Sequence, residues 1–364
     1  VFLLKKSLYG LRQAPRAWYK RLHNFLKTLD FDPLKNEPCL YCKVNNGTRI
    51  YLLLFVDDLI LCSSDLHQME IVKSALMSEF EMKDLGDLHC FLGIKIEKEA
   101  DGIYLSQSAY IERLLCKFAM NDCRPINTPM EIKSAEGSGS TATIIGQKPY
   151  RELIGSLMHL MLCTRPDLCF AVNYFSRFQS CATNEHWISL KRVLRYLRGT
   201  SHLRLHFPKN VDVPLCAYAD ADWANDADRK STSGYLVRIY GATVTWTTRK
   251  QPTIALSTCE AEFISLASAC TDVMWLTALL REMHIDPGVP TVFEDNQPTI
   301  RCVEKWEHKR LKHMDVKYNF IRDLVSEGVL KVVYVPTNLQ IADILTKSLV
   351  FIKFKFFREA LGLC

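Results

Sequence analysis

The sequence lacks any uninterrupted apolar run of the length that a membrane-spanning helix needs, about 20 residues. The apolar stretch from Tyr51 to Val56, for example, stops at two aspartates. The chain also lacks the order of a secretory leader, because its first four residues are apolar and precede Lys5 and Lys6. We therefore expect no membrane partner. The first residue is not Met, and we expect the chain to be a piece of a longer precursor.

A disulfide framework is also lacking, although the chain has 14 cysteines. Such frameworks belong to small secreted domains, whereas the cysteines here are irregularly spaced in a long chain. The one CxxC, from Cys39 to Cys42, has no second Cys or His pair at zinc-finger spacing near it. We predict reduced, mostly buried thiols rather than a zinc site.

The composition shows no strong excess of charge of either sign. The apolar fraction of 48% and the charged fraction of 24% are typical of a globular protein. The net charge of +6 is mild for a nucleic-acid-binding protein, so the distribution of charge matters more than its sum. A length of 364 residues is too great for one ordinary core, which predicts two or three domains.

The first 105 residues have the pattern of an α+β domain. Apolar residues at helical spacing predict a helix over residues 13–30, whose other face is basic. Two strand-like runs flank Asn45-Asn46-Gly47, which is a strong hairpin signal. Asp57 and Asp58 follow the second run, and we expect them at another tight turn.

The middle of the chain, residues 106–208, is expected to be a helical connecting domain. A Ser-, Gly- and Thr-rich stretch near residues 131–147 interrupts the periodicity and is expected to be a linker. The helix predicted over residues 186–198 carries four basic residues largely on one face: Lys191, Arg192, Arg195 and Arg198. This face is either a solvated surface or a contact with nucleic-acid phosphates.

The last part, residues 209–348, has the element order of an α/β domain. Its patterns predict three antiparallel strands, a long helix, a strand, two helices, a further strand and a final helix. Residues 349–364 are expected to be a tail, whose Phe- and Lys-rich run at 351–357 the pattern does not explain. We therefore predict an α/β chain: an α+β first domain, a helical connection and a final α/β domain.

Four acidic residues of this last domain lie where strands end and helices start. Asp220 and Asp295 end strands. Glu262 lies in the first turns of the long helix, and Asp343 opens the final helix. Taken singly, each could be a helix cap or a surface charge. Because strand ends and helix starts meet at one edge of an α/β domain, they could also cluster. Clustered carboxylates repel one another unless cations lie between them, and their hard oxygen atoms suit Mg²⁺ or Mn²⁺.

The sequence around these acids resembles the ribonuclease H domain of copia-type LTR retrotransposons. The resemblance rests on six strings: Tyr218-Ala219-Asp220-Ala221-Asp222-Trp223, Asp228-Arg229-Lys230-Ser231-Thr232-Ser233-Gly234-Tyr235, Leu256-Ser257-Thr258-Cys259-Glu260-Ala261-Glu262-Phe263, Asp295-Asn296-Gln297, Lys312-His313-Met314-Asp315-Val316-Lys317 and Ile341-Ala342-Asp343-Ile344-Leu345-Thr346-Lys347. It implies an RNase H-like α/β domain with a mixed five-stranded sheet.

The resemblance also implies a metal-dependent reaction, the hydrolysis of the RNA strand of an RNA–DNA hybrid. The implied catalytic residues, which would also be the ligands of two Mg²⁺ (or Mn²⁺) ions, are Asp220, Glu262, Asp295 and Asp343. Glu262 rather than Glu260 is the implied ligand, because the residues from Glu262 to Leu266 fit the family's frame.

The first domain resembles the reverse transcriptase palm of the same family. Asp57 and Asp58 lie where the palm has its catalytic turn, with Phe55 in place of the usual Tyr. The other matching strings are Lys5-Lys6-Ser7-Leu8-Tyr9-Gly10-Leu11-Arg12-Gln13-Ala14-Pro15-Arg16-Ala17-Trp18-Tyr19, Phe80-Glu81-Met82-Lys83-Asp84-Leu85-Gly86, Phe91-Leu92-Gly93-Ile94 and, in the connecting region, Arg165-Pro166-Asp167 and Leu194-Arg195-Tyr196-Leu197. The resemblance implies that Asp57 and Asp58 are catalytic residues of a partial polymerase metal site.

The nucleic-acid contacts that we expect are with primer–template and with hybrid. The residues expected to make them are Lys5, Lys6, Arg12, Gln13, Lys191, Arg192, Arg195, Lys309 and Arg310. The family's first polymerase carboxylate and its fingers lie before the point at which this chain starts. We therefore expect the chain alone to be unable to extend a primer.

Three readings of the function stay open. The first is a fragment of a retrotransposon Pol polyprotein with an RNase H-type endonuclease, working beside the rest of the polyprotein in a cytoplasmic virus-like particle. The second is a decayed or domesticated remnant that binds nucleic acid without chemistry. The third is a polymerase activity inherited from the palm. The sequence does not predict the oligomeric state.

Overall fold

The structure, a computed structural model, describes residues 7–8, 10–45, 47–132, 148–209, 211–213, 215–304 and 315–364. They divide into two units: unit 1 comprises Val1–Leu88 and Trp275–Asp286, and unit 2 comprises His89–Met274 and Pro287–Cys364. The boundaries expected at residues 105 and 208 do not coincide with this division. Several predicted features lie outside the described residues: Lys5, Lys6, Asn46, most of the linker, Lys309 and Arg310.

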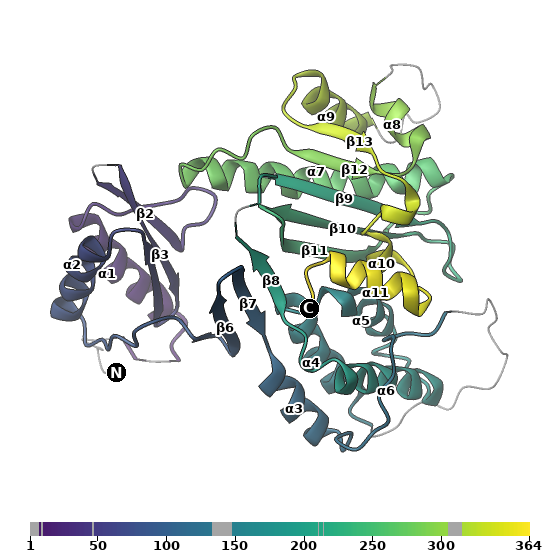
Figure 1. Cartoon of the computed structure of the whole chain (residues 1–364), viewed down its shortest axis with the longest axis horizontal. Coiled ribbons are helices and arrows are strands. Elements are labelled where there is room, and N and C mark those ends of the chain that lie inside the picture. The colour runs from purple at the N-terminus through teal and green to yellow at the C-terminus, as the bar shows by residue number, and fades with distance from the viewer. Residues whose placement is uncertain are drawn as a thin grey trace, which may run out of the picture. The chain divides into compact units, whose positions relative to one another are not determined.

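Unit 1 contains a four-stranded antiparallel sheet and two helices that share its core (Figure 1). The strands lie in the order β1-β2-β3-β4, namely β1 (Asp32–Pro33), β2 (Leu40–Asn45), β3 (Thr48–Phe55) and β4 (Asp58–Ser63). The helices are α1 (Ala14–Thr28) and α2 (Leu66–Glu79). The helix predicted over residues 13–30 and the hairpin around Gly47 are confirmed.

Strand β3 shows how the sequence forms the core of unit 1. Its alternate residues Ile50, Leu52 and Leu54 are buried, since successive side chains of a strand point to opposite faces. They pack with Leu22 of α1 and with Leu76 of α2. One face of the sheet is thereby covered by apolar side chains of the two helices.

Unit 2 begins with an antiparallel sheet and a helical region. The sheet has the order β5-β6-β7-β8, made of β5 (Cys90–Phe91), β6 (Ile94–Glu99), β7 (Gly102–Ser106) and β8 (Leu205–Pro208). The helices are α3 (Ser108–Lys117), α4 (Tyr150–Cys163), η1 (Pro166–Leu168), α5 (Cys169–Ser176) and α6 (Asn184–Gly199). The short strand β8 was not predicted, because it pairs with β7 about a hundred residues earlier in the chain, a register that local patterning does not reveal.

The second sheet of unit 2 is mixed and has five strands in the order β11-β10-β9-β12-β13. The strands are β9 (Leu215–Asp222), β10 (Thr232–Ile239), β11 (Ala242–Lys250), β12 (Thr291–Glu294) and β13 (Lys331–Tyr334). The first three are antiparallel neighbours, whereas β12 runs parallel to both β9 and β13. The predicted mixed five-stranded sheet is confirmed.

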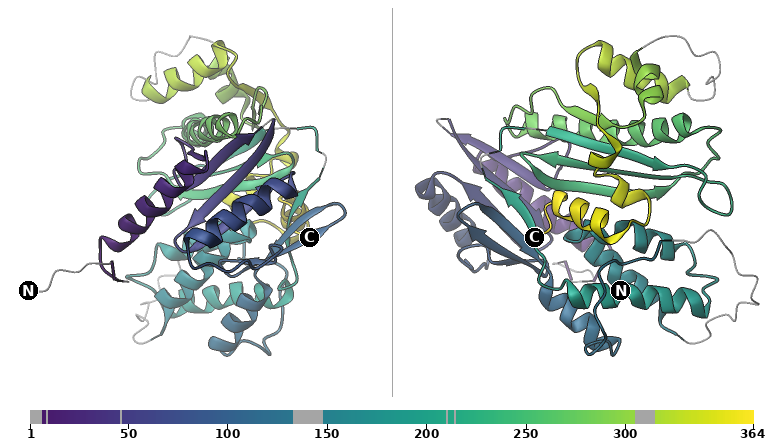
Figure 2. Two further views of the ribbon diagram at one scale, coloured as in Figure 1. Left: turned by 90° about the vertical axis from the view of Figure 1, so that its left-hand side faces the viewer. Right: turned by 45° about the vertical axis from the view of Figure 1, so that its right-hand side comes forward.

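Helices pack on both faces of this sheet (Figure 1, Figure 2). One face meets α7 (Thr258–Glu282), in which Ser265 Oγ donates a hydrogen bond to Gly234 O of β10 at 3.2 Å. The other face meets α5 and the short α10 (Asp343–Thr346). The remaining helices of the domain are α8 (Gln297–Glu304), α9 (Asp315–Ser326), η3 (Thr337–Leu339) and α11 (Phe351–Ala360).

Among the described helices, α7 is the one long and apolar enough to cross a membrane. Most of its apolar window is nevertheless buried inside the protein, which is also expected of the central helix of an α/β domain. The apolar composition of α7 therefore has a packing explanation.

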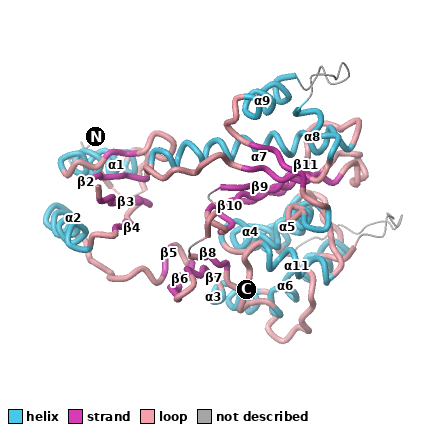
Figure 3. Tube along the Cα trace, turned by 45° about the horizontal axis from the view of Figure 1, so that its top comes forward, coloured by secondary structure: helices cyan, strands magenta, loops and turns pink. Residues whose placement is uncertain are grey.

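Residues 351–360, within the predicted tail, form the helix α11 (Figure 3). Its Phe354 and Phe357 are buried in the same core as Leu157 of α4 and Val193 of α6. Phe354 contacts the ring of Tyr196 edge-on, with centroids 5.7 Å apart. The Phe-rich run thus supplies core side chains to the helical region.

The prediction that the cysteines are mostly buried is wrong. All 14 are free thiols, as predicted, but they are not mostly buried. Five of them are exposed: Cys62, Cys90, Cys116, Cys181 and Cys364. The prediction failed because cysteines lie on solvent-facing positions of strands and helices as well as in the core.

A buried ion pair links the helices of unit 2. Arg165 binds Asp167 through two hydrogen bonds of 3.0 and 2.8 Å, and it also donates to Thr200 O at 3.0 Å. Tyr196 donates to the same carboxylate at 2.6 Å. Burial by itself would lower the pKa of Arg165, but the Asp167 carboxylate raises it above its usual value. Arg165 therefore stays charged inside the core.

Removal of one partner of this pair should destabilise unit 2 strongly. Asp167→Asn leaves the Arg165 guanidinium buried without a counter-charge, which costs about 3–5 kcal/mol. The measurement is the urea midpoint of unfolding of the full chain, with the exposed Asp122→Asn as the control. Equal midpoints for the two variants would contradict the prediction.

Candidate functional site

Three of the four predicted carboxylates converge at one edge of the five-stranded sheet. Asp220 lies near the end of β9, Glu262 in the first turns of α7, and Asp295 directly after β12. One carboxylate oxygen from each lies within 4.8 Å of the others. Three acids that are far apart in the sequence thus lie close together, because the ends of β9 and β12 and the start of α7 meet at this edge.

The environment of these acids is buried and rich in negative charge. Asp220 is 2% exposed and Glu262 is 7% exposed. Burial raises the pKa of Asp220 to about 6, and the Asp343 and Asp295 carboxylates act in the same direction. Burial and the Asp220 carboxylate raise the pKa of Glu262 well above its usual range. Ionisation of Asp220 and Glu262 is therefore unfavourable in the folded protein, and a bound cation would make it more favourable.

The donor set fits a divalent metal ion. Glu262 Oε2 is buried and has no hydrogen-bond partner, although buried polar atoms are almost always paired. Oxygen atoms of three carboxylates at this spacing are the ligands that Mg²⁺ and Mn²⁺ prefer. An unpaired, buried carboxylate oxygen beside two others marks a place for a hard cation.

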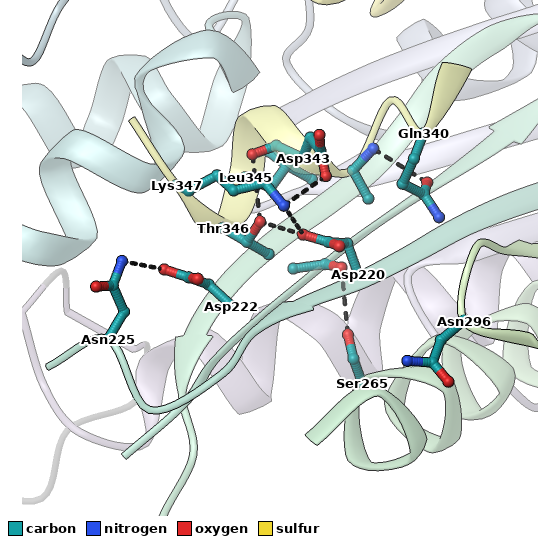
Figure 4. A network of polar contacts seen from close by, with 12 residues as sticks. Asp220, Asp222, Asn225, Ser265, Asn296, Gln340, Asp343, Leu345, Thr346 and Lys347 are labelled. Atoms are coloured by element: carbon teal, nitrogen blue, oxygen red, sulfur yellow. Dashed lines mark hydrogen bonds and ion pairs between the residues drawn. The ribbon is translucent and has the colours of Figure 1, made fainter. Parts of the chain in front are cut away.

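The fourth predicted carboxylate, Asp343, lies at the start of α10 and is fully buried. It is outside the group of three, and two lysines contact it. Lys347 Nζ lies 2.8 Å from Asp343 Oδ1 and 3.6 Å from Asp220 Oδ2, so this ammonium bridges the two acids (Figure 4). Lys353 of α11 makes a close ion pair with Asp343 Oδ2.

The approach of α10 to the sheet depends on Gly234 of β10. A Cβ at this position would lie 2.6 Å from Thr346 Cγ2 and 2.8 Å from Leu345 Cβ. Gln340 Nε2 donates to Ala219 O at 2.8 Å, which fixes the segment before α10 against β9. The missing side chain of Gly234 therefore allows Asp343 and Lys347 to reach Asp220.

The two glutamates at the start of α7 have separate roles. Ser257 Oγ accepts a hydrogen bond from Glu260 N at 3.2 Å, and Glu260 Oε2 accepts one from Leu256 N at 2.8 Å. This closely resembles a capping box, with the reciprocal bond one residue earlier than in the standard pattern. Glu260 thus belongs to the helix end, while Glu262 points to the other acids.

Sequence reasoning missed three charged residues of the site. Glu294 is fully buried, with its pKa raised well above its usual range by burial, and its Oε2 atom has no partner. Lys347 and Lys353 are the other two. The string Glu294-Asp295 and the Lys after Thr346 were visible signals, but neither indicates which acid the side chain meets.

The predicted polymerase remnant lies in unit 1. The turn between β3 and β4 is tight, because Phe55 pairs with Asp58, and the predicted turn is confirmed. Asp57 and Asp58 are exposed, and neither is part of a group of three close metal-ligating side chains in the described chain. Val56 adopts φ +54°, which a β-branched residue rarely does, and Trp18 Nε1 donates to its carbonyl at 2.6 Å.

The predicted nucleic-acid contacts differ in their surroundings. Arg12 and Gln13 are exposed at the start of α1. In α6, Arg192 pairs with Glu131 at 2.5 Å, and Arg195 Nε donates to Arg124 O at 2.9 Å. These two arginines hold the segment after α3, a structural role that the sequence analysis did not foresee, and contact with phosphates stays a prediction for them. Lys191 lies over the ring of Trp187, 5.9 Å from its centroid.

A side chain at position 234 should disturb the site. Gly234→Ala forces α10 away from the sheet, because the new Cβ overlaps Leu345 and Thr346. We expect a loss of about 1–3 kcal/mol of stability and a weaker stabilisation by Mg²⁺. Thermal unfolding with and without Mg²⁺ measures both. Gly155→Ala is the control, since a Cβ there meets nothing within 4 Å, and an equal effect of both variants would refute the assignment.

The raised pKa of Asp220 predicts a dependence of stability on pH without divalent ions. The folded state binds the proton more tightly than the unfolded state, whose carboxyl has the usual value of 3.8, so the free energy of unfolding falls as pH rises from about 4 to about 6. The side chain introduced by Asp220→Asn cannot ionise. In this variant the decrease in the free energy of unfolding over this pH range should therefore be smaller by up to about 3 kcal/mol. Denaturation at several pH values in EDTA tests this, and parallel pH profiles would contradict it.

Comparisons with known proteins show which proteins this chain resembles. Residues 1–132 match the family model of reverse transcriptase (RNA-dependent DNA polymerase). The whole chain is 38% identical to the retrovirus-related Pol polyprotein from transposon TNT 1-94 of Nicotiana tabacum, of which it spans 28%. A putative transposon Ty5-1 protein of Saccharomyces cerevisiae is 30% identical over 75% of this chain and 90% of its own length.

A solved structure, an RNase H1 isolated from compost, is 16% identical, with a TM-score of 0.30, and covers 37% of this chain and 93% of its own. The sequence relatives cover both the first domain and the region that carries the carboxylates. The resemblance on which the sequence analysis rested is confirmed. The chain belongs to the family of copia-type retrotransposon Pol polyproteins, and its first 132 residues match their reverse transcriptase.

Proposed function

We propose that the chain hydrolyses the RNA strand of RNA–DNA hybrids in a reaction that depends on divalent metal ions. The observation that carries this proposal is the convergence of Asp220, Glu262 and Asp295 at one edge of the mixed sheet, with a buried and unpaired oxygen on Glu262. Membership of the Pol family supports a nucleic acid as the substrate.

The first ion would be held by Asp220, Glu262 and Asp295, and a second by Asp220 and Asp343. Bound Mg²⁺ or Mn²⁺ would lower the pKa of a water molecule and neutralise charge on the phosphodiester. The chain's own residues fix the geometry for this: Gln340 and Gly234 set the position of α10, and Thr346 donates a hydrogen bond to the Asp220 carboxylate.

Recognition of a hybrid requires contacts that distinguish RNA from DNA. In general, 2′-hydroxyl groups and the shape of the groove provide this distinction. Exposed basic residues would bind the backbone phosphates, which makes the affinity dependent on salt. Of the predicted contacts, Arg12 and Gln13 are exposed, whereas Arg192 and Arg195 would have to bind phosphate through donors that the segment after α3 leaves unused.

We also propose that this chain alone does not extend a primer. Asp57 and Asp58 are two acids on an exposed turn, and a polymerase metal site needs a further carboxylate beside them. In the described part of the chain no third metal-ligating side chain lies close to the pair. Primer extension by the purified chain, measured on a labelled primer–template, would overturn this part of the proposal.

A non-catalytic remnant that binds nucleic acid is the second candidate. The ion pairs of Lys347 with Asp220 and Asp343 favour it, because they satisfy charge at the site without a metal ion. The unpaired oxygen of Glu262 favours the nuclease instead.

The decisive experiment uses a labelled RNA–DNA hybrid and the purified full chain. We expect cleavage of the RNA strand with Mg²⁺, no cleavage in EDTA, and a loss of at least about a hundredfold for Asp295→Asn, since a lost ligand removes stabilisation of the transition state. Asp323→Asn is the matched control and should retain full activity, because Asp323 is an exposed residue of α9.

The two candidate functions give different results in this assay. Binding of the hybrid by a folded chain without any metal-dependent cleavage would reject the nuclease and support the non-catalytic remnant. Cleavage that persists in Asp295→Asn would show that another site performs it.

A further inference from the structure

Lys347 lies between Asp220, which belongs to the group of three acids, and Asp343, which lies outside it. It follows α10 directly, four residues after Asp343, so a single helical turn places its side chain beside that acid. Its Nζ atom is 2.8 Å from Asp343 Oδ1 and 3.6 Å from Asp220 Oδ2 (Figure 4). The side chain as a whole is 32% exposed.

An ammonium ion and a divalent metal ion compete for such a position. Both are attracted by the same carboxylate oxygen atoms. An ammonium and a metal ion that are bound to the same carboxylate lie close together, and their positive charges repel each other strongly in a buried site. In the group of Asp220, Glu262 and Asp295 this competition involves Asp220 directly, because the ammonium lies 3.6 Å from Asp220 Oδ2, and no ion pair joins it to Glu262 or Asp295 among the described contacts. The site is therefore asymmetric.

We propose that Lys347 is the resident cation of the Asp220–Asp343 side of the site and sets how many divalent ions the chain holds. The first ion binds at Asp220, Glu262 and Asp295 with Lys347 in place. A second ion binds between Asp220 and Asp343 only when it displaces the Lys347 ammonium. This inference deepens the proposed function and rests on it for the presence of the first ion.

The surroundings of Asp343 make this displacement feasible. Asp343 is fully buried, and a buried carboxylate without a counter-charge is strongly unfavourable. Lys353 of α11 forms a second close ion pair with Asp343, on Oδ2. Because Lys353 remains when Lys347 moves, Asp343 keeps one positive partner throughout. Lys347 is thus the exchangeable cation and Lys353 the fixed one.

A purely structural role for Lys347 makes a different prediction. A structural counter-charge would contribute to stability, and its removal would weaken the binding of both ions through a disordered site. A competing cation would instead weaken only the second ion, and its removal would strengthen that binding. The two roles therefore differ in the sign of the effect on metal affinity.

The test measures Mn²⁺ binding to the purified full chain, by titration calorimetry and by the electron paramagnetic resonance signal of free Mn²⁺. We expect one tight site and one weak site in the unmodified chain. Lys347→Met should tighten the second site by about tenfold or more, because the site is competent only in the fraction of molecules whose ammonium has left. Lys347→Arg keeps the charge and should leave the second site weak.

Lys355→Met is the matched control. Lys355 lies on α11, has a side chain that is 52% exposed, and pairs with Glu359 rather than with the site. It should bind Mn²⁺ as the unmodified chain does. If Lys347→Met fails to fold, Lys347→Gln tests the same assignment, since it also removes the charge and should likewise tighten the second site.

Three results would overturn the inference: two equally tight ions in the unmodified chain, an unchanged second site in Lys347→Met, or a loss of both sites in a folded Lys347→Met protein. Its failure is distinguishable from failure of the proposed function. A chain that binds Mn²⁺ as expected but does not cleave hybrid refutes the nuclease and supports the role of Lys347. No Mn²⁺ binding in any variant refutes both.

Discussion

The burial of several like charges at one point is the constraint on which unit 2 depends. Asp220, Glu262, Glu294 and Asp343 are nearly or fully buried close to one another, and their mutual repulsion opposes folding. Protonation, which the raised pKa values of Asp220 and Glu262 favour, or a nearby cation offsets this repulsion. Lys347 and Lys353 supply positive charge on the Asp343 side, while Glu262 retains an unpaired oxygen on the other side. The stability of the fold and the capacity of these acids to hold a cation therefore depend on one electrostatic balance.

The helical region and the five-stranded sheet share a single core, which explains how that balance is kept. Phe354 and Phe357 of α11 lie in the core with helices α4 and α6, and the same helix brings Lys353 to Asp343. Arg358, further along α11, donates to Tyr196, which also binds the buried Asp167 carboxylate. The helical connection is thereby coupled to the carboxylate site through packed side chains rather than through a flexible linker.

The strands and helices of the sheet domain were largely predictable from the sequence. Alternation and helical periodicity predicted a strand and two helices after the long helix, and the structure has β12, α8 and α9 there. The short strand β8 and the helix α11 were not predictable. The pairing of β8 with β7 and the burial of Phe354 depend on residues far away in the chain, and no local pattern records them.

The sequence by itself determined the family and the order of elements, because these depend on local residue patterns. The tertiary structure alone decided how the acids are distributed. It brought Asp220, Glu262 and Asp295 together, placed Glu294 behind them and set Lys347 between Asp220 and Asp343. The physical reason is that the charge state of a buried carboxylate depends on neighbours within a few ångströms, and those neighbours come from strands and helices that only folding brings into contact.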